Sequence, residues 1–445
     1  MIGRRAIVVG AGMAGLAAAS AAAPYFDDVL VLERDSLPSD TSPRSGTPQA
    51  RHVHGLLCGG QQALAALLPG FEQKLRAAGA VPLRVGLDTL SERAGYDPFP
   101  QRDLGWLSYY LSRSLLELVV RQEVEKLANV TIRSRYRVTA IQATLTGEVV
   151  GVVCDDPVGR KEMLPADLII DASGRGVPTL SYLKAGGWPL PEKSIIGVDI
   201  NYSTAIFAIP KDAFYNWKAV MTIPNAPYSN RRGVMFPLEG NRWIVTIGGM
   251  HGTKMPLDEC GVLTYLRGLR TQTIYNAVRH AKRLGDIARY GFVASEWQHF
   301  EELAKFPQGL LPIGDSYCRF NPVYGQGMSV AAQEAVLLRD LLAASVGTHD
   351  PLRALVPRFF SGAKAIIAGP WTMVENLDLI WPETVGTRPR DFEKRVAFGS
   401  ALTRLAADDP AVHQLTIEVQ HLLKPVSALR SPEVLERVLA TTAVA

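Results

Sequence analysis

A short glycine-rich turn between two apolar runs constrains the fold of this chain more than any other feature. Residues 7–9 are apolar, residues 10–15 read Gly-Ala-Gly-Met-Ala-Gly, residues 16–23 are rich in alanine, and residues 29–32 are apolar again. This order predicts a buried strand, a tight turn, a helix and a second strand parallel to the first. The beginning of the chain is therefore expected to form the βαβ unit of a Rossmann-like domain.

Each glycine of this turn has a separate physical role in holding a dinucleotide. Gly10 allows the tight turn out of the strand, Gly12 lets the backbone approach a pyrophosphate, and Gly15 lets the helix pack against the strand. Ala14 belongs to the same turn and is a candidate contact. The N-terminus of the following helix offers unpaired N–H groups and the positive end of its dipole to phosphates.

An acidic residue closes the second apolar run at the expected distance from the turn. Glu33 lies about 20 residues after the glycines, where a carboxylate accepts hydrogen bonds from ribose hydroxyls. A carboxylate there would repel the ribose phosphate of NADP, while Arg34 beside it leaves that exclusion open. Both Glu33 and Arg34 are therefore candidate binding residues.

The bulk composition is that of a globular protein with two or three structural units. The chain has 445 residues, of which 47% are hydrophobic and 20% are charged. The net charge is +4, and the sequence contains no run of basic residues. We therefore expect no nucleic-acid partner.

Neither the cysteines nor the histidines predict a metal site. The four cysteines are far apart, which favours free thiols in a reducing cytosol. His52 and His54 are a possible ligand pair, but no third ligand is evident, so we expect no metal. No apolar run reaches about 18 residues, and the first strand begins too early for a signal peptide. We expect a cytoplasmic protein without a transmembrane segment; peripheral membrane contact stays open.

Two further segments end a buried strand with glycine and acidic residues. Residues 167–171 read Asp-Leu-Ile-Ile-Asp and continue into Ala-Ser-Gly-Arg-Gly. Residues 310–313 are apolar and lead into a Gly-Asp pair, and residues 321–328 read Asn-Pro-Val-Tyr-Gly-Gln-Gly-Met before a strong helical pattern. Both segments repeat the strand-to-turn signal of the first one.

The three segments together resemble the flavoprotein monooxygenases of the aromatic-hydroxylase superfamily, which bind FAD in a Rossmann-like domain. In that family a Gly-Asp pair is followed by a proline and by Gly-x-Gly at a helix start, as it is here. The resemblance implies that Asp315, next to Gly314, hydrogen-bonds the ribityl chain. It also implies that Gly325, Gly327 and Met328 bring backbone N–H groups to the isoalloxazine. A helix N-terminus suits the electron-rich pyrimidine edge of a reduced, anionic flavin.

The second segment departs from the aromatic-hydroxylase pattern. That pattern has Asp-Gly followed by Ser and Arg, whereas two residues separate Asp171 from Gly174 here. This form is more similar to squalene epoxidase, the bacterial polyether epoxidases and the geranylgeranyl reductases. Asp171 stays a candidate cofactor contact, and two electron routes stay open: NAD(P)H acting directly, or a separate flavin reductase.

Three further residues are assigned to the cofactor by the resemblance alone. Residues 48–57 are similar to the loop after strand two in bacterial epoxidase-like flavin monooxygenases, which would put Arg51 near the flavin phosphates or ring. Arg113 matches an arginine that often meets the FAD pyrophosphate; a solvated helix face is the alternative. Val138 would give backbone contacts to adenine on the same analogy.

The expected architecture is an α/β protein with a Rossmann-like FAD-binding domain, an inserted β-rich substrate domain and a helical C-terminal region. The FAD-binding domain is predicted over residues 1–185 and 289–345, the β-rich domain over 186–288 and the helical region over 346–445. Residues 107–127 are expected to form one long amphipathic helix, because leucines recur there near helical spacing.

The resemblance implies an FAD-dependent monooxygenase that inserts one oxygen atom of O2 into an apolar or aromatic small molecule. Hydroxylation or epoxidation would proceed through a flavin C4a-hydroperoxide, so no catalytic side chain is predicted. Two alternatives stay open: a flavin-dependent reductase of isoprenoid double bonds, and a flavin-dependent halogenase, whose Trp-x-Trp-x-Ile-Pro signature is not found. Apolar residues of the insert are expected on the substrate wall or in plain core: Phe207, Met221, Met235, Phe236 and Trp243.

Overall fold

A parallel sheet forms the first structural unit of the computed structural model, which describes residues 1–144 and 147–443. Its strand order is β16-β10-β1-β2-β6, and every neighbouring pair is parallel. The strands are β1 (Gly3–Val9), β2 (Phe26–Glu33), β6 (Val130–Ser134), β10 (Leu168–Asp171) and β16 (Leu310–Pro312). The predicted βαβ unit is present, with α1 (Met13–Ala22) between β1 and β2.

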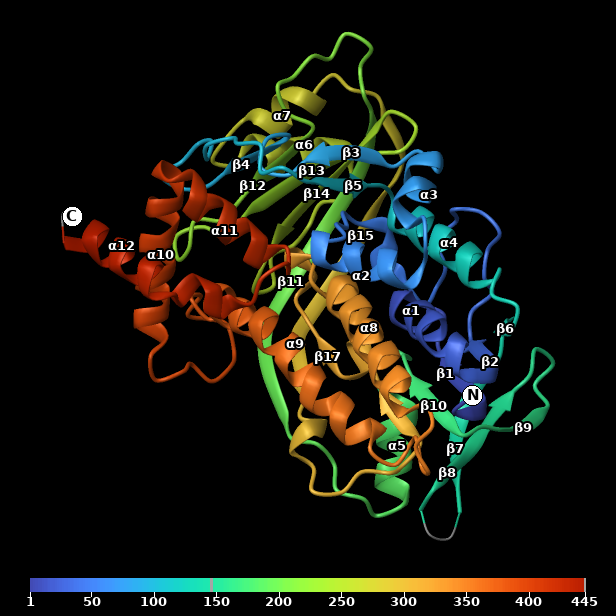
Figure 1. Cartoon of the computed structure of the whole chain (residues 1–445). Helices are drawn as coiled ribbons and strands as arrows, with labels where there is room; N and C mark the ends of the chain where they lie inside the picture. Colours follow the sequence, from blue (N-terminus) through green and yellow to red (C-terminus); the bar gives the residue numbers. More distant parts are fainter. Residues whose placement is uncertain (145–146, 444–445) are drawn as a thin grey trace.

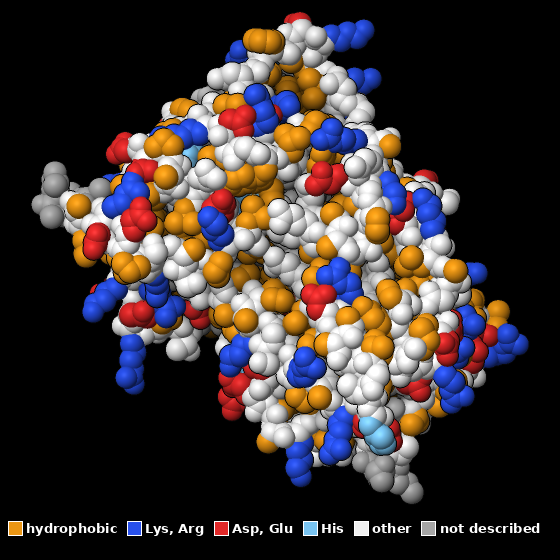
Figure 2. All heavy atoms as spheres, in the orientation of Figure 1, with side chains coloured by type: hydrophobic (Ala, Val, Ile, Leu, Met, Phe, Trp, Pro, Cys, Tyr) orange, Lys and Arg blue, Asp and Glu red, His pale blue; other side chains and the backbone are white. Residues whose placement is uncertain are grey.

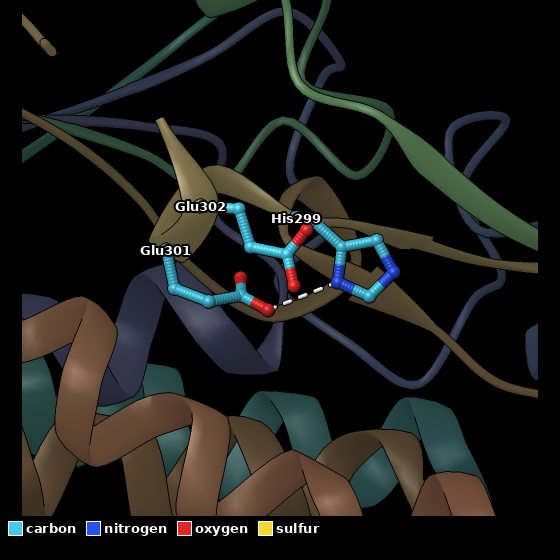
Figure 3. A group of neighbouring side chains, drawn as sticks. All are labelled: His299, Glu301 and Glu302. Carbon is cyan, nitrogen blue, oxygen red and sulfur yellow. Dashed lines mark hydrogen bonds and ion pairs between the residues drawn. The ribbon is translucent and has the colours of Figure 1, made fainter. Parts of the chain in front are cut away.

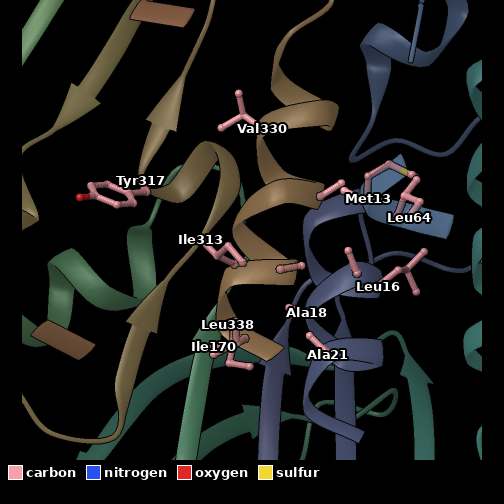
Figure 4. Close-up of a cluster of buried hydrophobic side chains, with 14 of the residues drawn as sticks. Met13, Leu16, Ala18, Ala21, Leu64, Ile170, Ile313, Tyr317, Val330 and Leu338 are labelled. Carbon is pink, nitrogen blue, oxygen red and sulfur yellow. The ribbon is translucent and has the colours of Figure 1, made fainter. Parts of the chain in front are cut away.

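The two faces of this sheet are covered by different layers. Side chains of β1 and β2 that point one way pack with α1 and α8 (Gly327–Ser345), and Figure 4 shows Leu16 and Ala18 of α1 in the same cluster as Val330 of α8. The alanines of α1 have no bulk beyond Cβ, so the helix can lie close to its neighbours. Side chains that point the other way, such as Ile7 and Leu30, pack against an antiparallel sheet of β7 (Arg137–Ala143), β8 (Val149–Asp155) and β9 (Lys161–Pro165).

A second, mostly antiparallel sheet follows in the order β17-β15-β11-β14-β13-β12-β4. Its strands are β4 (Thr89–Glu92), β11 (Lys193–Ala208), β12 (Ala219–Thr222), β13 (Arg232–Leu238), β14 (Arg242–Gly249), β15 (Arg283–Gln298) and β17 (Cys318–Arg319). The helices α6 (Glu259–Arg267) and α7 (Thr273–Val278) cover one of its faces. Figure 1 shows β11 and β15 running through the length of the molecule.

The remaining elements complete the covering of the two sheets. The C-terminal part is helical, as predicted, and α9 packs along α8 (Figure 1). Its helices are α9 (Leu355–Asp378), α10 (Phe392–Asp408), α11 (Pro410–Gln420) and α12 (Pro432–Ala443). The other helices are α2 (Cys58–Leu67), α3 (Phe71–Ala77), α4 (Arg113–Val124) and α5 (Val177–Ala185), and a short ladder joins β3 (Val81–Arg84) to β5 (Leu107–Tyr110).

One expectation about local structure is wrong. Residues 107–127 do not form one helix: β5 pairs with β3, and α4 begins only after Ser112, whose Oγ accepts a hydrogen bond from the N–H of Leu115 at 3.2 Å. The N-cap serine marks the true start, which a count of apolar spacing misses. The segment 186–288 contains α6 and α7 in addition to its strands.

The surface carries charges of both signs. On the face shown in Figure 2, lysines and arginines are interspersed with acidic and apolar side chains. Among the described residues, none of the helices combines the length and the apolar composition needed to cross a bilayer.

Candidate functional site

The parallel sheet brings the three predicted segments to one edge. Because β1, β2, β10 and β16 run in the same direction, their carboxyl ends meet. Gly10 follows β1, Glu33 ends β2, Asp171 ends β10, and Gly314 and Asp315 follow β16. Ligands of open α/β sheets bind outside this edge.

The three glycines of the first turn differ in what the fold demands of them. Gly10 has φ +101°, and a Cβ there would lie 2.7 Å from the carbonyl O of Ala172. A Cβ on Gly15 would lie 1.9 Å from the carbonyl O of Gly10, so the fold requires both glycines. Gly12 has φ −76°, and a Cβ there would meet only the end of the Arg44 side chain at 3.9 Å. The described protein does not need glycine at position 12, whereas a phosphate approaching the backbone would.

The start of α1 also offers free donors. The backbone N–H groups of Gly12, Met13 and Ala14 have no hydrogen-bond partner among the described residues. A Cβ on Gly314 would lie 2.6 Å from the Cβ of Ala14, so the first turn of α1 abuts the Gly314-Asp315 turn. An anion at this helix N-terminus would therefore lie beside the third segment.

The Glu33 carboxylate is buried and fixed in orientation. Its Oε2 accepts the N–H of Ala11 at 2.8 Å, and its Oε1 accepts the N–H of Asp35 at 2.9 Å. Since Oε1 has this one partner among the described residues, it keeps a lone pair for a ribose hydroxyl. Arg34, the next residue, is exposed and makes no ion pair within the described chain.

A buried ion-pair network that the sequence did not reveal joins this carboxylate to α4. The Arg44 Nη1 lies 3.1 Å from Glu33 Oε2, and its Nε lies 2.8 Å from Glu117 Oε1. Glu117 Oε2 in turn lies 2.9 Å from Arg113 Nη2. Arg113 is thus held at the site, not on a solvated helix face, and it is 7% exposed. The i,i+4 spacing of Arg113 and Glu117 is readable in the sequence, but Arg44 lies in a loop without a pattern.

Two other predicted residues lie at the margins of this arrangement. Arg51 is exposed, and no ion pair joins it to the described residues. Val138 is half-buried on β7, two residues after Tyr136, whose N–H donates to the carbonyl O of Glu33 at 2.9 Å. Val138 is therefore close to the end of β2, where the cofactor's adenosine part is expected.

The Asp171 carboxylate forms hydrogen bonds with neighbouring groups of the protein. Its Oδ2 accepts hydrogen bonds from the N–H of Thr179 at 3.1 Å and the Thr179 hydroxyl at 2.6 Å, and its Oδ1 accepts the N–H of Ser173 at 3.0 Å. The side chain is fully buried. These bonds fix the loop between β10 and α5, so the carboxylate shapes the edge of the site.

Asp315 follows Gly314 shortly after the end of β16. Its side chain is exposed to solvent, yet the surrounding protein raises the pKa of its carboxyl to about 6 by burial, against the opposing charges of Arg319 and Arg113. Behind it, the fully buried Glu334 of α8 accepts the N–H of Gly314 at 2.7 Å. Burial raises the pKa of Glu334 to about 8, partly offset by the N–H of Gly314.

The segment before α8 is the one that the resemblance assigns to the flavin ring. Gly325 has φ +67°, a conformation that favours glycine. Gly327 does not need to be glycine for steric reasons, because a Cβ there would meet only Asp315 Oδ1 at 3.6 Å. The N–H groups of Gly327 and Met328 have no partner among the described residues. Gly327 thus resembles Gly12: glycine is not required sterically, and backbone N–H groups beside it have no partner in the described chain.

Residues 48–57, which contain His52 and His54 and are called the histidine loop below, pack between the two sheets. His52 Nδ1 lies 2.7 Å from the Thr204 hydroxyl of β11, and the N–H of Leu57 donates to Ser329 Oγ of α8 at 3.0 Å. Burial lowers the pKa values of His52 and His54 to about 4, and Arg113 contributes to the shift of His54. Both imidazoles are therefore neutral at pH 7, and the loop connects β11 to α8.

The residues expected on the substrate wall or in plain core lie mostly in core. Phe207, Met235 and Trp243 pack with α6 and α7, on the face of the second sheet that is turned away from the first unit. Phe236 packs with Leu83 in a separate cluster, with Met221 at its margin.

One group of side chains has the composition of a metal site but not its chemistry. His299, Glu301 and Glu302 offer ligand atoms within 4.8 Å of one another (Figure 3). His299 Nδ1 is 2.9 Å from Glu301 Oε1, and its Nε2 is 2.8 Å from the Ser194 hydroxyl. Lys364 Nζ lies 3.6 Å from Glu302 Oε1. Because these atoms already have partners and a cation lies beside them, the group is a structural polar cluster.

Solved structures with the same fold are flavoenzymes. Flavin-dependent brominase Bmp2 has a TM-score of 0.70 and 14% identity, covering 99% of this chain and 98% of that one. The myxobacterial chondrochloren halogenase CndH has a TM-score of 0.63 and 18% identity, covering 95% and 97%. PqsL, a probable FAD-dependent monooxygenase from Pseudomonas aeruginosa, has a TM-score of 0.59 and 14% identity, covering 89% and 98%. At these identities the likeness shows the fold, and it agrees with the predicted fold class.

One protein has a sequence related to that of this chain. No protein-family model matches the chain. Protein Rv3254 of Mycobacterium tuberculosis (strain ATCC 25618 / H37Rv) is 32% identical over 352 residues, which cover 76% of this chain and 73% of that protein. This protein belongs to the same family as Rv3254.

Proposed function

We propose that this protein is an FAD-dependent monooxygenase that inserts one oxygen atom of O2 into an apolar or aromatic small molecule, by hydroxylation or epoxidation. Electrons come from NAD(P)H, either directly or through a flavin reductase. The observation that carries the proposal is the pair Gly12 and Gly327. Each begins a helix at the carboxyl edge of the sheet, and neither needs to be glycine for the described protein to fold.

The residues present fit an extended dinucleotide. Glu33 would accept the ribose hydroxyls, the start of α1 would bind the pyrophosphate, and Asp315 would meet the ribityl chain. The N–H groups of Gly327 and Met328 would face the pyrimidine edge of the ring, where the α8 dipole favours negative charge. Bound FAD would supply the reaction with O2, and the protein would orient the substrate and exclude water.

The first test is the loss of bound flavin. We expect the purified protein to hold FAD, visible as a yellow flavin spectrum, and the Gly12→Val protein to lose it because the added side chain fills the approach to the backbone. Retention of FAD by a folded Gly12→Val protein would overturn the site assignment. Substrate turnover should also consume O2; turnover that persists without oxygen would instead indicate a reductase of isoprenoid double bonds.

Halogenation is the second candidate, favoured by the likeness in fold to flavin-dependent halogenases. Both activities would need FAD and O2, so halide separates them. A product that forms only when bromide or chloride is present, and carries the halogen by mass spectrometry, would decide for halogenation. A product heavier by one oxygen atom, formed without halide, would decide for monooxygenation.

A further inference from the structure

A row of polar side chains crosses the second sheet on the face toward the first unit. Tyr290 of β15 pairs with Tyr202 of β11, Tyr202 pairs with Gly248 of β14, and Gly248 pairs with Arg232 of β13. Residues directly opposite one another have side chains on the same face of a sheet. The His52 ring packs against Tyr202 and Tyr290, with ring centroids 6.0 and 5.6 Å away, which identifies this face as the one toward the first unit.

Because Gly248 has no side chain, the Tyr202 ring can lie over β14, the strand that separates Tyr202 from Arg232. A Cβ on Gly248 would lie 2.9 Å from Cδ1 of Tyr202, so the phenol ring lies across β14 at this point. The Tyr202 ring is nearly parallel to the Tyr290 ring, with an interplanar angle of 7° and centroids 6.3 Å apart. The two parallel rings and Arg232 thus lie side by side along one face of the sheet.

Arg232 is a half-buried cation without an acidic partner. No carboxylate of a described residue lies within 4.0 Å of its guanidinium, and its Nη2 contacts only the sulfur of Met250, at 3.4 Å. Its Nε and the nearby hydroxyl of Tyr202 are buried without a hydrogen-bond partner in the described chain. Leaving such donors unpaired costs free energy, so their presence calls for a ligand.

The nearest acidic group does not satisfy this cation. Asp378, at the end of α9, lies close enough for Arg232 to lower its pKa, although burial raises it more strongly. Its oxygens are taken by the Asn321 amide, at 3.0 and 3.2 Å, and by the Tyr324 hydroxyl, at 2.6 Å. The donor groups of the guanidinium therefore stay available for another oxyanion.

The row lies beside the proposed flavin site. Tyr324 directly precedes Gly325, and the His52 ring, 5.6 Å from the Tyr290 ring, belongs to the loop whose Gly55 carbonyl O would lie 3.4 Å from a Cβ on Gly325. Tyr290 and Tyr324 are both partly exposed, whereas Tyr202 beneath them is buried.

We propose that the Tyr290–Tyr202–Arg232 row is the substrate platform and selects a planar aromatic molecule with an anionic oxygen substituent, a carboxylate or a phenolate. The inference rests on the proposed function, because it takes the ring site beside Gly325 as given. The partly exposed ring of Tyr290, supported by the buried Tyr202 ring, stacks against the substrate ring. The planar fork of Arg232 binds the oxyanion through charge-assisted hydrogen bonds.

The test uses the holoprotein and two probes that differ only in charge, 2-naphthoate and 2-naphthamide. Binding is read from perturbation of the flavin absorption spectrum, so no turnover is needed. We expect 2-naphthoate to bind at least tenfold more tightly than 2-naphthamide. In the Arg232→Met protein the affinity for 2-naphthoate should fall tenfold or more with the amide unaffected.

The neighbouring arginine provides the matched control. Arg231 donates to the carbonyl O of Tyr265 at 2.8 Å and lies over the Tyr265 ring, on the opposite face. Arg231→Met should therefore leave the binding of both probes unchanged. Equal affinity of the two probes, or unchanged 2-naphthoate binding by a folded Arg232→Met protein, would overturn the platform.

Failure of the proposed function gives a different result. If the purified protein holds no flavin, the rise of Tm with 2-naphthoate replaces the spectrum as the readout. A rise that Arg232→Met abolishes keeps the platform while the oxygenase proposal fails. If 2-naphthoate changes neither the flavin spectrum nor Tm, the platform itself is wrong.

Discussion

Gly12 and Gly15 are one helical turn apart and have the same side chain, yet the structure uses them differently. The Cβ positions decide this: 1.9 Å to a backbone oxygen at Gly15, and 3.9 Å to the Arg44 guanidinium at Gly12. The sequence motif already assigns the two positions different roles, and the Cβ positions give the physical basis of the difference. The structure requires glycine at position 15 and leaves space at position 12 for the proposed ligand.

The two glycines should therefore respond differently to alanine. Gly15→Ala should lower the free energy of unfolding by about 3 kcal/mol or more, because the methyl group overlaps the Gly10 carbonyl. Gly12→Ala should change it by less than about 1 kcal/mol but weaken FAD binding about tenfold or more. Urea unfolding and flavin titration measure the two effects. Equal destabilisation by both substitutions would contradict the distinction.

Glu334 should make the protein less stable as the pH rises. Its carboxyl pKa is about 8 in the folded protein and near the ordinary 4.5 when unfolded. Between these values the folded state binds the extra proton, so stability is full below about pH 4.5 and is lost as the pH rises through about 8. Glu334→Gln keeps an acceptor for the N–H of Gly314 and does not titrate. We expect its loss of stability between pH 5 and 8 to be smaller by on the order of 3 kcal/mol.

Urea unfolding at several pH values measures this difference. Asp315, whose pKa is raised to about 6, titrates in both proteins and accounts for the slope that remains. Parallel pH profiles for the wild-type and Glu334→Gln proteins would show that Glu334 is charged when buried.

At the scale of elements, the crossing of α2 and α8 positions the start of α8. A Cβ on Gly60 would lie 2.6 Å from the Cα of Ser329 and 2.5 Å from its Oγ. Ser329 lies two residues after Gly327 and accepts the hydrogen bond from Leu57 that holds the histidine loop. The close approach of these helices therefore sets the position of the predicted ring-binding turn.

Gly60→Ala should push the two helices apart. We expect a loss of about 2 kcal/mol in the free energy of unfolding together with weaker FAD binding. Gly399→Ala is the control, since Gly399 lies in α10 and a Cβ there would have no atom of the described chain within 4 Å. That substitution should stabilise by about 0.5–1 kcal/mol. If both variants were equally stable, the helix crossing would not be tight.

Elements with a strong internal pattern could be predicted from the sequence, and those defined by tertiary pairing could not. The β1–α1–β2 unit, β10 and α8 lie where hydrophobic pattern and turn residues place them. β5 reads as part of a helix because Leu107 and Leu111 fit helical spacing, and its pairing with β3 is invisible in a local window. Arg44 escaped notice for the same reason, because three carboxylates from distant positions define its role.

At the scale of the whole molecule, cofactor binding and stability are linked. A ligand that binds only the folded state stabilises it by about 2.7 kcal/mol at a concentration one hundred times its Kd. We therefore expect Tm to rise with added FAD and to fall when the flavin is removed. The Gly12→Val protein should show no rise, and a rise in that variant would indicate binding elsewhere. Differential scanning fluorimetry with FAD and with AMP as a control nucleotide measures this.

The residues of the proposed substrate platform could not be predicted from sequence patterns. Tyr202, Arg232 and Tyr290 lie on three strands that are far apart along the chain, so their alignment depends on the register of the sheet. The apolar residues of the same strands were visible as a pattern, and most of them belong to core.

The two longest strands decide how the molecule can move. β11 and β15 have 16 residues each, which corresponds to about 50 Å of paired strands with two register irregularities, between Gly197 and Ile200 and between Thr204 and Ile206. We expect a pair of strands of this length to resist bending, so the two units should not open by rotating apart. Small molecules must then enter and leave by local movements of loops. Amide hydrogen exchange should be slow along both strands and fast in the loops around the proposed flavin site.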